Sequence, residues 1–478
     1  MSAYETVIGL EVHVHLCTKS KLFCSCPTTF GVEPNTNVCE VCSGMPGVLP
    51  VLNQTAVEYA TRAGLALNCT INNDSVFARK NYFYPDMPYN YQISQFERPL
   101  CEFGHLDINV GGEAKRIGIT RIHMETDAGK NIHEGDHSYL DLNRAAVPLI
   151  EIVSEPDMRS AEEVIAYLEK LRLIIQYLGA SDCKLQEGSM RADVNLSVRE
   201  AGSRELGTRT EMKNLNSFKA IARAIEGERK RQIELLEEGK RVVQETRRWD
   251  DNKESSKAMR SKEDAQDYRY FPDPDLVPVV ISDEWIARVK ARQPELRTEK
   301  IARYKEEYGL PEYDARLLTS SKHMADIFEE TTRLSGRPKE ASNWLMVEAM
   351  RLMKEQEMEL EDMEFSPSHL AALIRMVENN IINRTVAKTV FEEIFRHDAD
   401  PEAYVEENGL KVVKDEGALR DTVKAVMAAN PQSVEDYRNG REKAMGFLVG
   451  QTMKAMKGKA DPSMVNQLVR ELLAGGDV

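Results

Sequence analysis

The sequence predicts an α+β protein with a large, mainly antiparallel-sheet N-terminal domain, an all-helical domain and a small helical tail. From Tyr4 to about Pro278, apolar and polar residues alternate in short runs separated by Gly-, Pro- and Asn-rich turns, which is typical of strands. From about Pro294 onward the alternation stops, and Leu and Met recur at helical spacing among Glu, Lys and Arg. A chain of 478 residues also exceeds what one hydrophobic core normally serves. We therefore predict domains at 1–294, 295–405 and 406–478.

Three helices are expected to interrupt the strand-rich region, at 53–67, 161–178 and 217–239, because apolar residues there recur every three or four positions. In the helical part, Gly, Ser, Asp and Pro predict breaks at 335–338, 366–367 and 398–401. Turns at 430–431 and 458–462 are expected to divide the tail into three or four short helices.

Charge and hydropathy exclude some classes of protein. The formal net charge is −15, which argues against non-specific binding of nucleic acid through an overall positive field but is compatible with a local basic face. No apolar run approaches the ~20 residues of a membrane helix. The first residues show neither a basic region nor a small-residue cleavage site, so we expect a cytoplasmic chain without a secretory signal or membrane segment.

Carboxylates gather on one side of several predicted strands. Since strand side chains alternate between faces, each predicted strand can be divided into an apolar and a polar side. The polar sides hold Glu11, His13 and His15 in the first strand, Arg121, His123, Glu125 and Asp127 in the second, Asp193 and Asn195 in the third, and Glu211 and Lys213 in the fourth. Glu151 interrupts a run, 148–153, that would otherwise read as a fully buried strand.

Two interpretations of this face remain open. An antiparallel sheet with one solvated side shows the same alternation, and for any single strand that interpretation is preferred. Four strands rich in Glu, Asp and His are less usual, because clustered carboxylates repel one another unless a cation lies among them. Oxygen ligands with an imidazole suit Mg²⁺ or Mn²⁺, ions that normally act with phosphates. The pattern thus indicates a metal-assisted phosphoryl or acyl reaction.

The eight cysteines are unevenly distributed. Cys24, Cys26, Cys39 and Cys42 form two close pairs, and in a cytoplasmic chain this spacing favours a closed, structural Zn²⁺ site over four unligated thiols. The remaining cysteines have no neighbouring His pattern and are expected to be ordinary core or surface residues; they are Cys17, Cys69, Cys101 and Cys183.

Four segments carry a close resemblance to a known family: RKNYFYPDMPYNYQISQ (79–95), LNRAAVPLIEIVSEPD (142–157), EMKNLNSF (211–218) and DYRYFPDPDLVP (267–278). They resemble the B subunits of bacterial aspartyl/glutamyl-tRNA amidotransferases, and the resemblance runs along essentially the whole chain. It implies a heterotrimer with an amidase-like A subunit, which hydrolyses glutamine, and a small C subunit. It implies that the B subunit uses ATP to phosphorylate the side-chain carboxylate of Glu-tRNA(Gln) or Asp-tRNA(Asn), and that channelled ammonia then displaces the phosphate.

The resemblance also assigns roles to residues. The family's Mg²⁺-site pattern matches at Glu11, His13, Glu125, Asp193 and Glu211, and Glu151 is a further candidate ligand. Lys213 and Arg191 are expected either to neutralise phosphate oxygens of ATP or to pair with neighbouring carboxylates, and Asp127 receives no role. The four-cysteine cluster occurs in only some members of the family, so we expect it to serve stability rather than catalysis. Domain 1–294 would then be the catalytic cradle with the zinc-binding insertion.

The tail has a local reversal of charge. Between Gly440 and Ala460, Glu442 is the one acidic residue among five basic ones, Arg441, Lys443, Lys454, Lys457 and Lys459. A solvated helix face accounts for this, but the resemblance favours contact with the tRNA backbone, because the family's tail binds tRNA. For the aromatic run 81–86 with Tyr89 and Tyr91, stacking on adenine or the tRNA end and packing beneath a loop stay equally open.

Missing motifs narrow the chemistry further. The sequence has no P-loop and no kinase Gly-rich loop, so ATP must be held in another way, and no Ser/Gly-rich amidase segment, so the chain is not expected to make ammonia. Two rival functions remain: a stand-alone metal-dependent hydrolase, and a non-catalytic tRNA-binding module.

Overall fold

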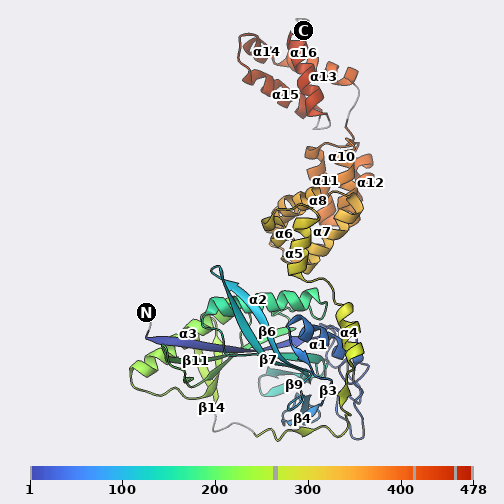
Figure 1. Cartoon of the computed structure of the whole chain (residues 1–478). Helices are drawn as coiled ribbons and strands as arrows, with labels where there is room; N and C mark the ends of the chain where they lie inside the picture. The colour runs from blue at the N-terminus through green and yellow to red at the C-terminus, as the bar shows by residue number, and fades with distance from the viewer. Residues whose placement is uncertain (1–2, 262–266, 413–415, 457–459, 475–478) are drawn as a thin grey trace. The chain divides into compact units, whose positions relative to one another are not determined.

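A computed structural model describes residues 3–261, 267–412, 416–456 and 460–474 (Figure 1). Contacts divide the chain into two units, Met1–Arg297 and Thr298–Val478. In the described residues, the first unit combines sheets and helices, whereas the second is helical throughout. The predicted α+β class with a helical C-terminal part is therefore confirmed.

The first unit is built on a sheet that has nine strands in its described part. All neighbouring strands in it are antiparallel except β12 and β13, which run parallel. In spatial order the strands are β14 (Ser255–Ser261), β13 (Glu245–Asp250), β12 (Thr210–Lys213), β11 (Met190–Glu200), β1 (Tyr4–His15), β10 (Pro148–Ser154), β7 (Glu113–Thr126), β6 (Cys101–Val110) and β2 (Thr70–Ile71). The N-terminal strand β1 thus lies in the middle of the sheet.

Smaller sheets flank the main one. They are β15 (Phe271–Pro272), β4 (Ala78–Asn81) and β5 (Tyr91–Ser94); β16 (Val279–Val280) and β3 (Asp74–Ser75); and the hairpin β8 (Lys130–Glu134) and β9 (His137–Asp141). Strand β5 lies beside β7, and the side-chain amide of Gln92 in β5 donates a 2.8 Å hydrogen bond to the Thr126 carbonyl in β7. The three-stranded sheet therefore stands next to the end of β7.

Helices cover one face of the main sheet. They are α1 (Gln54–Ala66), α2 (Ala161–Tyr177) and α3 (Phe218–Glu237), within the ranges that the sequence predicted. Each begins after a capping residue, Asn53, Ser160 or Ser217, whose side chain accepts backbone N–H groups of the first turn. In Figure 1, α2 and α3 lie side by side along this face. The core joins their apolar residues to the apolar side of β1, so the polar side of β1 faces away from the helices.

A fourth helix, α4 (Asp283–Ala291), precedes the point at which the sequence predicted the change to helical structure, about Pro294. Ser282 caps it by accepting the N–H of Trp285, and Val289 is its one fully buried residue. The helix has only nine residues, fewer than the roughly 11–18 over which helical periodicity is recognised, and no element was predicted from the sequence between about Pro278 and about Pro294.

The second unit contains two separate hydrophobic cores. The first is built from α5 (Arg297–Glu306), α6 (Glu312–Leu318), α7 (Lys322–Ser335), α8 (Pro338–Asn343), the π-helix Trp344–Ala349, α9 (Met350–Gln356), the 3₁₀ turn Leu360–Asp362, α10 (Pro367–Glu378), α11 (Arg384–His397) and α12 (Pro401–Glu407). The second is built from α13 (Glu416–Ala429), α14 (Pro431–Arg438), α15 (Lys443–Ala455) and α16 (Pro462–Ala474). No described helix combines the length and hydropathy needed to cross a membrane.

Proline marks the predicted breaks. Five helices begin at a proline in their first turn, at Pro338, Pro367, Pro401, Pro431 and Pro462, where the missing N–H leaves no helical hydrogen bond unmade. The predicted domain boundary at 405/406 falls inside α12, whose Val405 is buried in the first core of the unit. The helices of the tail therefore start at α13, beyond that boundary.

The position of β1 in the centre of the sheet yields a stability prediction. We expect Ile8→Ala to lower the free energy of unfolding of the first unit by about 2–5 kcal/mol, because Ile8 is fully buried and its truncation leaves a cavity. Urea unfolding read by hydrogen exchange on β1 peptides measures this. The control Val277→Ala alters a side chain that is 83% exposed and should change stability by less than about 0.5 kcal/mol. Equal effects of the two variants would contradict the described core.

Candidate active site and metal centres

The register of five strands brings the predicted polar side chains together. In β1, Glu11 lies opposite Asp193 of β11, and His13 lies opposite Glu151 of β10. Glu151 in turn lies opposite His123 of β7, and Asn195 lies opposite Glu211 of β12. Directly opposite residues project to the same face, with Cβ atoms about 5 Å apart. Antiparallel pairing alone therefore assembles residues that are up to 200 positions apart in sequence.

The six predicted Mg²⁺ ligands lie as two groups. His13, Glu125 and Glu151 form the first acidic cluster, and Glu11, Asp193 and Glu211 form the second acidic cluster. Within each cluster, one ligand atom from every residue lies within 4.8 Å of the others. The prediction treated these residues as one set, whereas their geometry describes two neighbouring sites.

In the first acidic cluster, imidazoles face carboxylates. His13 Nε2 lies 3.6 Å from Glu125 Oε1 and 3.4 Å from Glu151 Oε2. His123, which the sequence placed on this face without a role, is also buried here, with Nε2 3.1 Å from Glu151 Oε2. Burial lowers the pKa of His123, but Glu151 and Glu125 outweigh burial and raise it to about 9. For Glu151 the directions are reversed: burial raises its pKa, but the neighbouring His123 and His13 hold that pKa well below its ordinary value.

In the second acidic cluster, an ammonium group faces the carboxylates. Lys213 Nζ lies 2.7 Å from Asp193 Oδ2 and 2.8 Å from Glu211 Oε1, so the described structure realises the pairing that the sequence left open for this lysine. The Asn195 amide donates to Glu11 at 2.9 Å, and the Thr246 hydroxyl donates to Glu211 at 2.7 Å. Burial raises the pKa of Glu11, and the charge of Glu151 raises it further.

Asp127 has a structural explanation that the sequence did not supply. This buried carboxylate lies 2.7 Å from His15 Nε2, 3.1 Å from Arg144 Nε and 3.1 Å from Arg191 Nη2. Burial raises its pKa, but Arg191, His15 and Arg144 together hold it well below the ordinary value. Asp127 is thus satisfied by two guanidinium groups and one imidazole. Arg191 keeps a buried Nε that has no hydrogen-bond partner among the described residues.

A cavity of about 460 Å³ opens over both acidic clusters. Its lining includes His13, Glu125, Asp193, Arg191 and Lys213, together with Lys80, Tyr82 and Tyr268. Lys80, which the sequence did not single out, lies with Nζ 4.8 Å from the centre of the Tyr268 ring. Burial lowers the pKa of Lys80, but Glu125 and other neighbours raise it above its ordinary value, so the ammonium stays charged. Three basic side chains thus converge on one acidic cavity.

A second cavity, of about 220 Å³, adjoins the second acidic cluster because Glu11 lines it. Its walls come from β1, β10 and β11 and from the loop after β11, with Gly9, Ser154, Asn195, Leu206 and Arg209 among them. Apolar walls next to a few polar groups are typical of small-molecule sites. The candidate site therefore consists of two cavities, and residues of β1, β10 and β11 line both of them.

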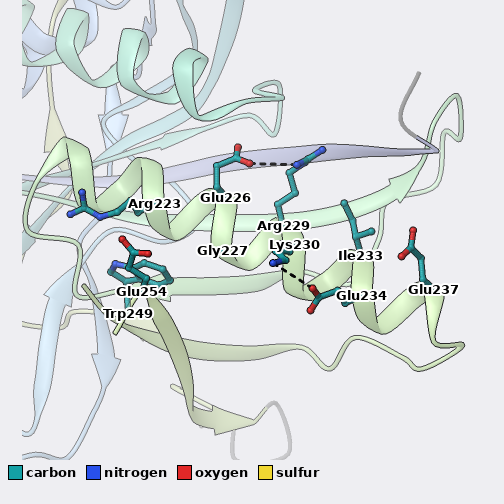
Figure 2. A pocket seen from close by; sticks show the side chains of 10 residues that line it. All are labelled: Arg223, Glu226, Gly227, Arg229, Lys230, Ile233, Glu234, Glu237, Trp249 and Glu254. Atoms are coloured by element: carbon teal, nitrogen blue, oxygen red, sulfur yellow. Dashed lines mark hydrogen bonds and ion pairs between the residues drawn. The ribbon is translucent and has the colours of Figure 1, made fainter. Parts of the chain in front are cut away.

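Volume alone does not mark a site in this unit. A groove of about 560 Å³ lies along α3 beside β13, with Trp249 against Gly227 (Figure 2). Its charges are compensated along the helix itself, as the Glu226–Arg229 and Lys230–Glu234 pairs in Figure 2 show. The groove also contains none of the metal-ligand clusters found among the described residues. We therefore assign no chemistry to it.

The four clustered cysteines have the geometry of a metal site. The sulfurs of Cys26 and Cys39 each lie 4.0 Å from that of Cys42, and Cys24 completes a group within 4.8 Å. A Zn–S bond of about 2.3 Å places tetrahedral sulfurs about 3.8 Å apart, whereas a disulfide brings them to about 2.05 Å. All four thiols are free of disulfides. The cluster therefore fits a four-thiolate metal site.

A buried lysine supports the same fit. Lys21 is completely buried, and its Nζ donates to Cys42 Sγ at 3.4 Å and to the Leu142 carbonyl at 3.2 Å. A buried ammonium needs an anionic partner, and a four-thiolate Zn²⁺ site carries a net charge of about −2. No sequence pattern singles out Lys21, because only the fold places it against the sulfurs.

The acidic clusters also fit divalent cations. Each offers carboxylate oxygens from separate strands, and the first adds an imidazole nitrogen, which is a donor set suited to Mg²⁺ or Mn²⁺. The second acidic cluster already holds the Lys213 ammonium between two of its carboxylates. Both clusters thus show the requirement for positive charge that a bound cation would meet.

Comparisons with known proteins decide the family. A family profile described as the GatB/GatE catalytic domain matches residues 6–287, and one described as the GatB domain matches residues 326–473. The aspartyl/glutamyl-tRNA(Asn/Gln) amidotransferase B subunit of Agathobacter rectalis is 68% identical over 475 residues, covering 99% of this chain and all of the relative. The chain belongs to this family of amidotransferase B subunits.

Two further members of the B-subunit family extend the match. The protein of Lachnoclostridium phytofermentans is 64% identical over 476 residues, covering 99% of this chain and all of the relative. That of Thermoanaerobacter pseudethanolicus is 57% identical over 472 residues, covering 98% of this chain and 99% of the relative. The B-subunit name identifies the chain as one component of a multi-subunit amidotransferase, as the resemblance implied.

For the aromatic residues of 81–86, Tyr89 and Tyr91 in this B-subunit chain, the sequence left two interpretations open: stacking on a ligand and packing beneath a loop. The Tyr89 hydroxyl donates to the Val41 carbonyl of the cysteine-rich segment, and the Arg79 guanidinium lies 4.2 Å from the centre of the Tyr91 ring. These two tyrosines are thus engaged in packing. Phe83 is 82% exposed, and Tyr82 lines the larger cavity, so for these two rings the stacking interpretation stays open.

The basic residues of the tail are placed only in part. Lys443 and Lys454 are exposed on α15. Arg441 lies 3.2 Å from Asp436, an acidic residue just outside the stretch that the sequence analysis compared. Lys457 and Lys459 lie outside the described residues.

We expect Cys39→Ser to release about one Zn²⁺ per chain and to lower the melting temperature, because three thiolates hold the ion more weakly than four. Activity at low temperature should persist, since the cluster supplies none of the residues that line the two cavities. Elemental analysis of the reduced protein and thermal denaturation measure both effects. Cys17→Ser, at an exposed cysteine outside the cluster, is the matched control. Zinc-free wild-type protein would contradict the site.

Proposed function

We propose that this chain activates and amidates the side-chain carboxylate of an aminoacyl-tRNA, using ATP and ammonia. The relatives are named for aspartyl/glutamyl-tRNA(Asn/Gln), which points to Glu-tRNA(Gln) or Asp-tRNA(Asn) as substrate. Within a cytoplasmic heterotrimer, an amidase-like A subunit would release ammonia from glutamine and a small C subunit would complete the assembly. The reaction is then that of a carbon–nitrogen ligase with glutamine as amido-nitrogen donor.

One observation carries this proposal: acidic clusters and three basic side chains, Lys80, Arg191 and Lys213, converge on a single cavity. A carboxylate is a poor acyl electrophile, so amidation requires its conversion into an acyl phosphate. Phosphoryl transfer is catalysed mainly by positioning and by cations that meet the phosphate charge. A cavity that holds both cation-binding carboxylates and ammonium and guanidinium groups suits that step.

The acidic clusters would hold the divalent cations. In the first cluster the ligands are His13, Glu125 and Glu151, and in the second they are Glu11, Asp193 and Glu211. Bound Mg²⁺ or Mn²⁺ neutralises the charge on the phosphate oxygens of ATP. A cation held by the second cluster would replace Lys213 as the partner of Asp193 and Glu211, and the Lys213 ammonium would then be left to contact the phosphate.

The two cavities suit the two substrates. The smaller cavity, with apolar Leu206 and the polar Asn195 and Arg209, leads to Glu11 and so suits the nucleotide. The larger cavity, lined by Tyr82 and Tyr268 as well as by the charged groups, suits the aminoacyl end of the tRNA. A carboxylate oxygen bonds to the γ-phosphorus as ADP leaves. Arg191, whose Nε is unused, and Lys80 would hold the resulting acyl phosphate while ammonia attacks its carbon and phosphate departs.

The rival functions make different predictions about ATP. A stand-alone metal-dependent hydrolase would release product without ATP, and a non-catalytic tRNA-binding module would bind tRNA without consuming ATP. Incubating the assembled complex with Mg²⁺, ATP and either aminoacylated or deacylated tRNA separates them. Our proposal requires ATP hydrolysis that depends on the aminoacylated form.

We expect Glu125→Gln to reduce tRNA-dependent ATP hydrolysis and amide formation by about 10²-fold or more, because it removes one ligand charge while keeping the side chain's shape. Glutaminase activity of the complex should survive, since the A subunit carries it, and raised Mn²⁺ should restore part of the loss. Steady-state assays of the complex measure all three quantities. The control is Glu134→Gln, an exposed residue of β8. Amidation at the wild-type rate by Glu125→Gln would contradict the proposal and would show that the polar face is merely solvated.

The tail yields a prediction about salt. We expect Lys443→Gln with Lys454→Gln to weaken tRNA binding and to reduce the slope of log K against log salt concentration by about 2, roughly 1 for each phosphate contact removed. Glutaminase activity should not change. Filter-binding titrations at several salt concentrations measure the slope, and Lys339→Gln with Lys354→Gln, two exposed lysines outside the tail, is the charge-matched control. An unchanged slope would show that the tail lysines are simply solvated.

A further inference from the structure

His123 is buried against the first acidic cluster, but it is not part of the ligand set. The group of ligand atoms within 4.8 Å of one another contains His13, Glu125 and Glu151 and leaves His123 out. Only 3% of His123 is exposed, and its Nδ1 is buried without a hydrogen-bond partner among the described residues. A buried polar atom without a hydrogen-bond partner lowers the stability of the fold, so its presence here calls for an explanation.

The two oxygens of Glu125 face different partners. Oε1 lies 3.6 Å from His13 Nε2, within the ligand set. Oε2 lies 3.8 Å from His123 Nε2 and 3.4 Å from the Ser94 hydroxyl, which donates to it. Glu125 Oε1 thus contacts an imidazole of the ligand set, whereas Oε2 contacts His123 and Ser94.

Glu151 is held by the same imidazole. His123 Nε2 lies 3.1 Å from Glu151 Oε2, the shortest contact between an imidazole and a carboxylate in this cluster. The pairing of β10 with β7 fixes this contact, since Glu151 and His123 lie directly opposite each other. The strand pairing therefore places the His123 ring beside the Glu151 carboxylate.

We propose that His123 is a positioning residue, which donates its Nε2–H to Glu151 and, with Ser94, fixes the Glu125 and Glu151 carboxylates in the orientation that binds the divalent cation. Carboxylates rotate readily, and partners that hold metal ligands in place typically contribute 10–100-fold to metal affinity. This inference rests on the proposed function, because it concerns the cation site on which that function depends.

A pair of amide substitutions isolates the role of Nε2. The amide nitrogen of Gln occupies nearly the position of histidine Nε2, whereas that of Asn occupies nearly the position of Nδ1. His123→Gln therefore retains a donor toward the carboxylates, and His123→Asn moves the donor to the nitrogen that has no partner. His137→Gln, at an exposed histidine of β9, controls for the loss of an imidazole.

The test is Mn²⁺ binding to the assembled complex, measured by electron paramagnetic resonance without ATP or tRNA. We expect His123→Asn to weaken one class of Mn²⁺ site by about 10–100-fold, and His123→Gln to remain within about threefold of wild type. His137→Gln should bind as wild type does. Unchanged zinc content and melting temperature in each variant show that the fold is retained.

Two results would overturn the inference. Wild-type Mn²⁺ affinity in His123→Asn would show that the imidazole positions nothing. Complete loss of that Mn²⁺ site in both His123→Asn and His123→Gln would show that His123 is itself a ligand. Glu125→Gln, measured alongside, distinguishes failure of this inference from failure of the proposed function: if Glu125→Gln binds Mn²⁺ as wild type does, the cation site itself is wrong.

Discussion

Repulsion among carboxylates on one side of the central sheet is the constraint on which the rest of this structure depends. Two like charges 4 Å apart repel by about 4 kcal/mol at the effective dielectric constant typical of protein sites. Basic groups lie among these carboxylates and reduce the repulsion: the imidazoles of His13 and His123, the ammonium of Lys213, and the guanidinium of Arg191. Carboxylates and basic groups thus lie side by side on this face, which is the arrangement that the proposed phosphate chemistry requires.

The same strands build the core and the site. Strand β1 buries Ile8, Leu10, Val12 and Val14 against the helices and presents Glu11 and His13 to the cavities. A shift of one residue in its register would exchange these two sets, so the apolar side of β1 fixes the position of the acidic side. Stability and chemistry are therefore coupled through one register, and the fixed backbone keeps ligands from separate strands in place.

The sequence predicted the local features well and the long-range ones in part. Alternation identified the polar side of each strand, apolar periodicity identified α1 to α3, and Gly, Ser, Asp and Pro identified the later breaks, because these signals act over a few residues. The division of the acidic residues into two clusters was not predictable, since it depends on which strands are neighbours. Lys80 and Lys21 were missed for the same reason: β4 and the cysteine-rich segment bring them to their sites through tertiary contacts. Helix α4 was not predicted because its nine residues are too few for helical periodicity to be recognised.

The central claim is that ATP activates the side-chain carboxylate in this cavity, and an isotope measurement tests it most directly. Aminoacyl-tRNA labelled with ¹⁸O in both side-chain carboxylate oxygens is incubated with the assembled complex, ATP, Mg²⁺ and glutamine, and the released phosphate is analysed by mass spectrometry. If an acyl phosphate forms, ammonia attacks its carbonyl carbon, and phosphate leaves with the oxygen that bridged carbon and phosphorus. Each phosphate released during amide formation then carries one ¹⁸O. Amide formation with unlabelled phosphate would contradict the account, because ATP would then have been consumed without bonding to the carboxylate.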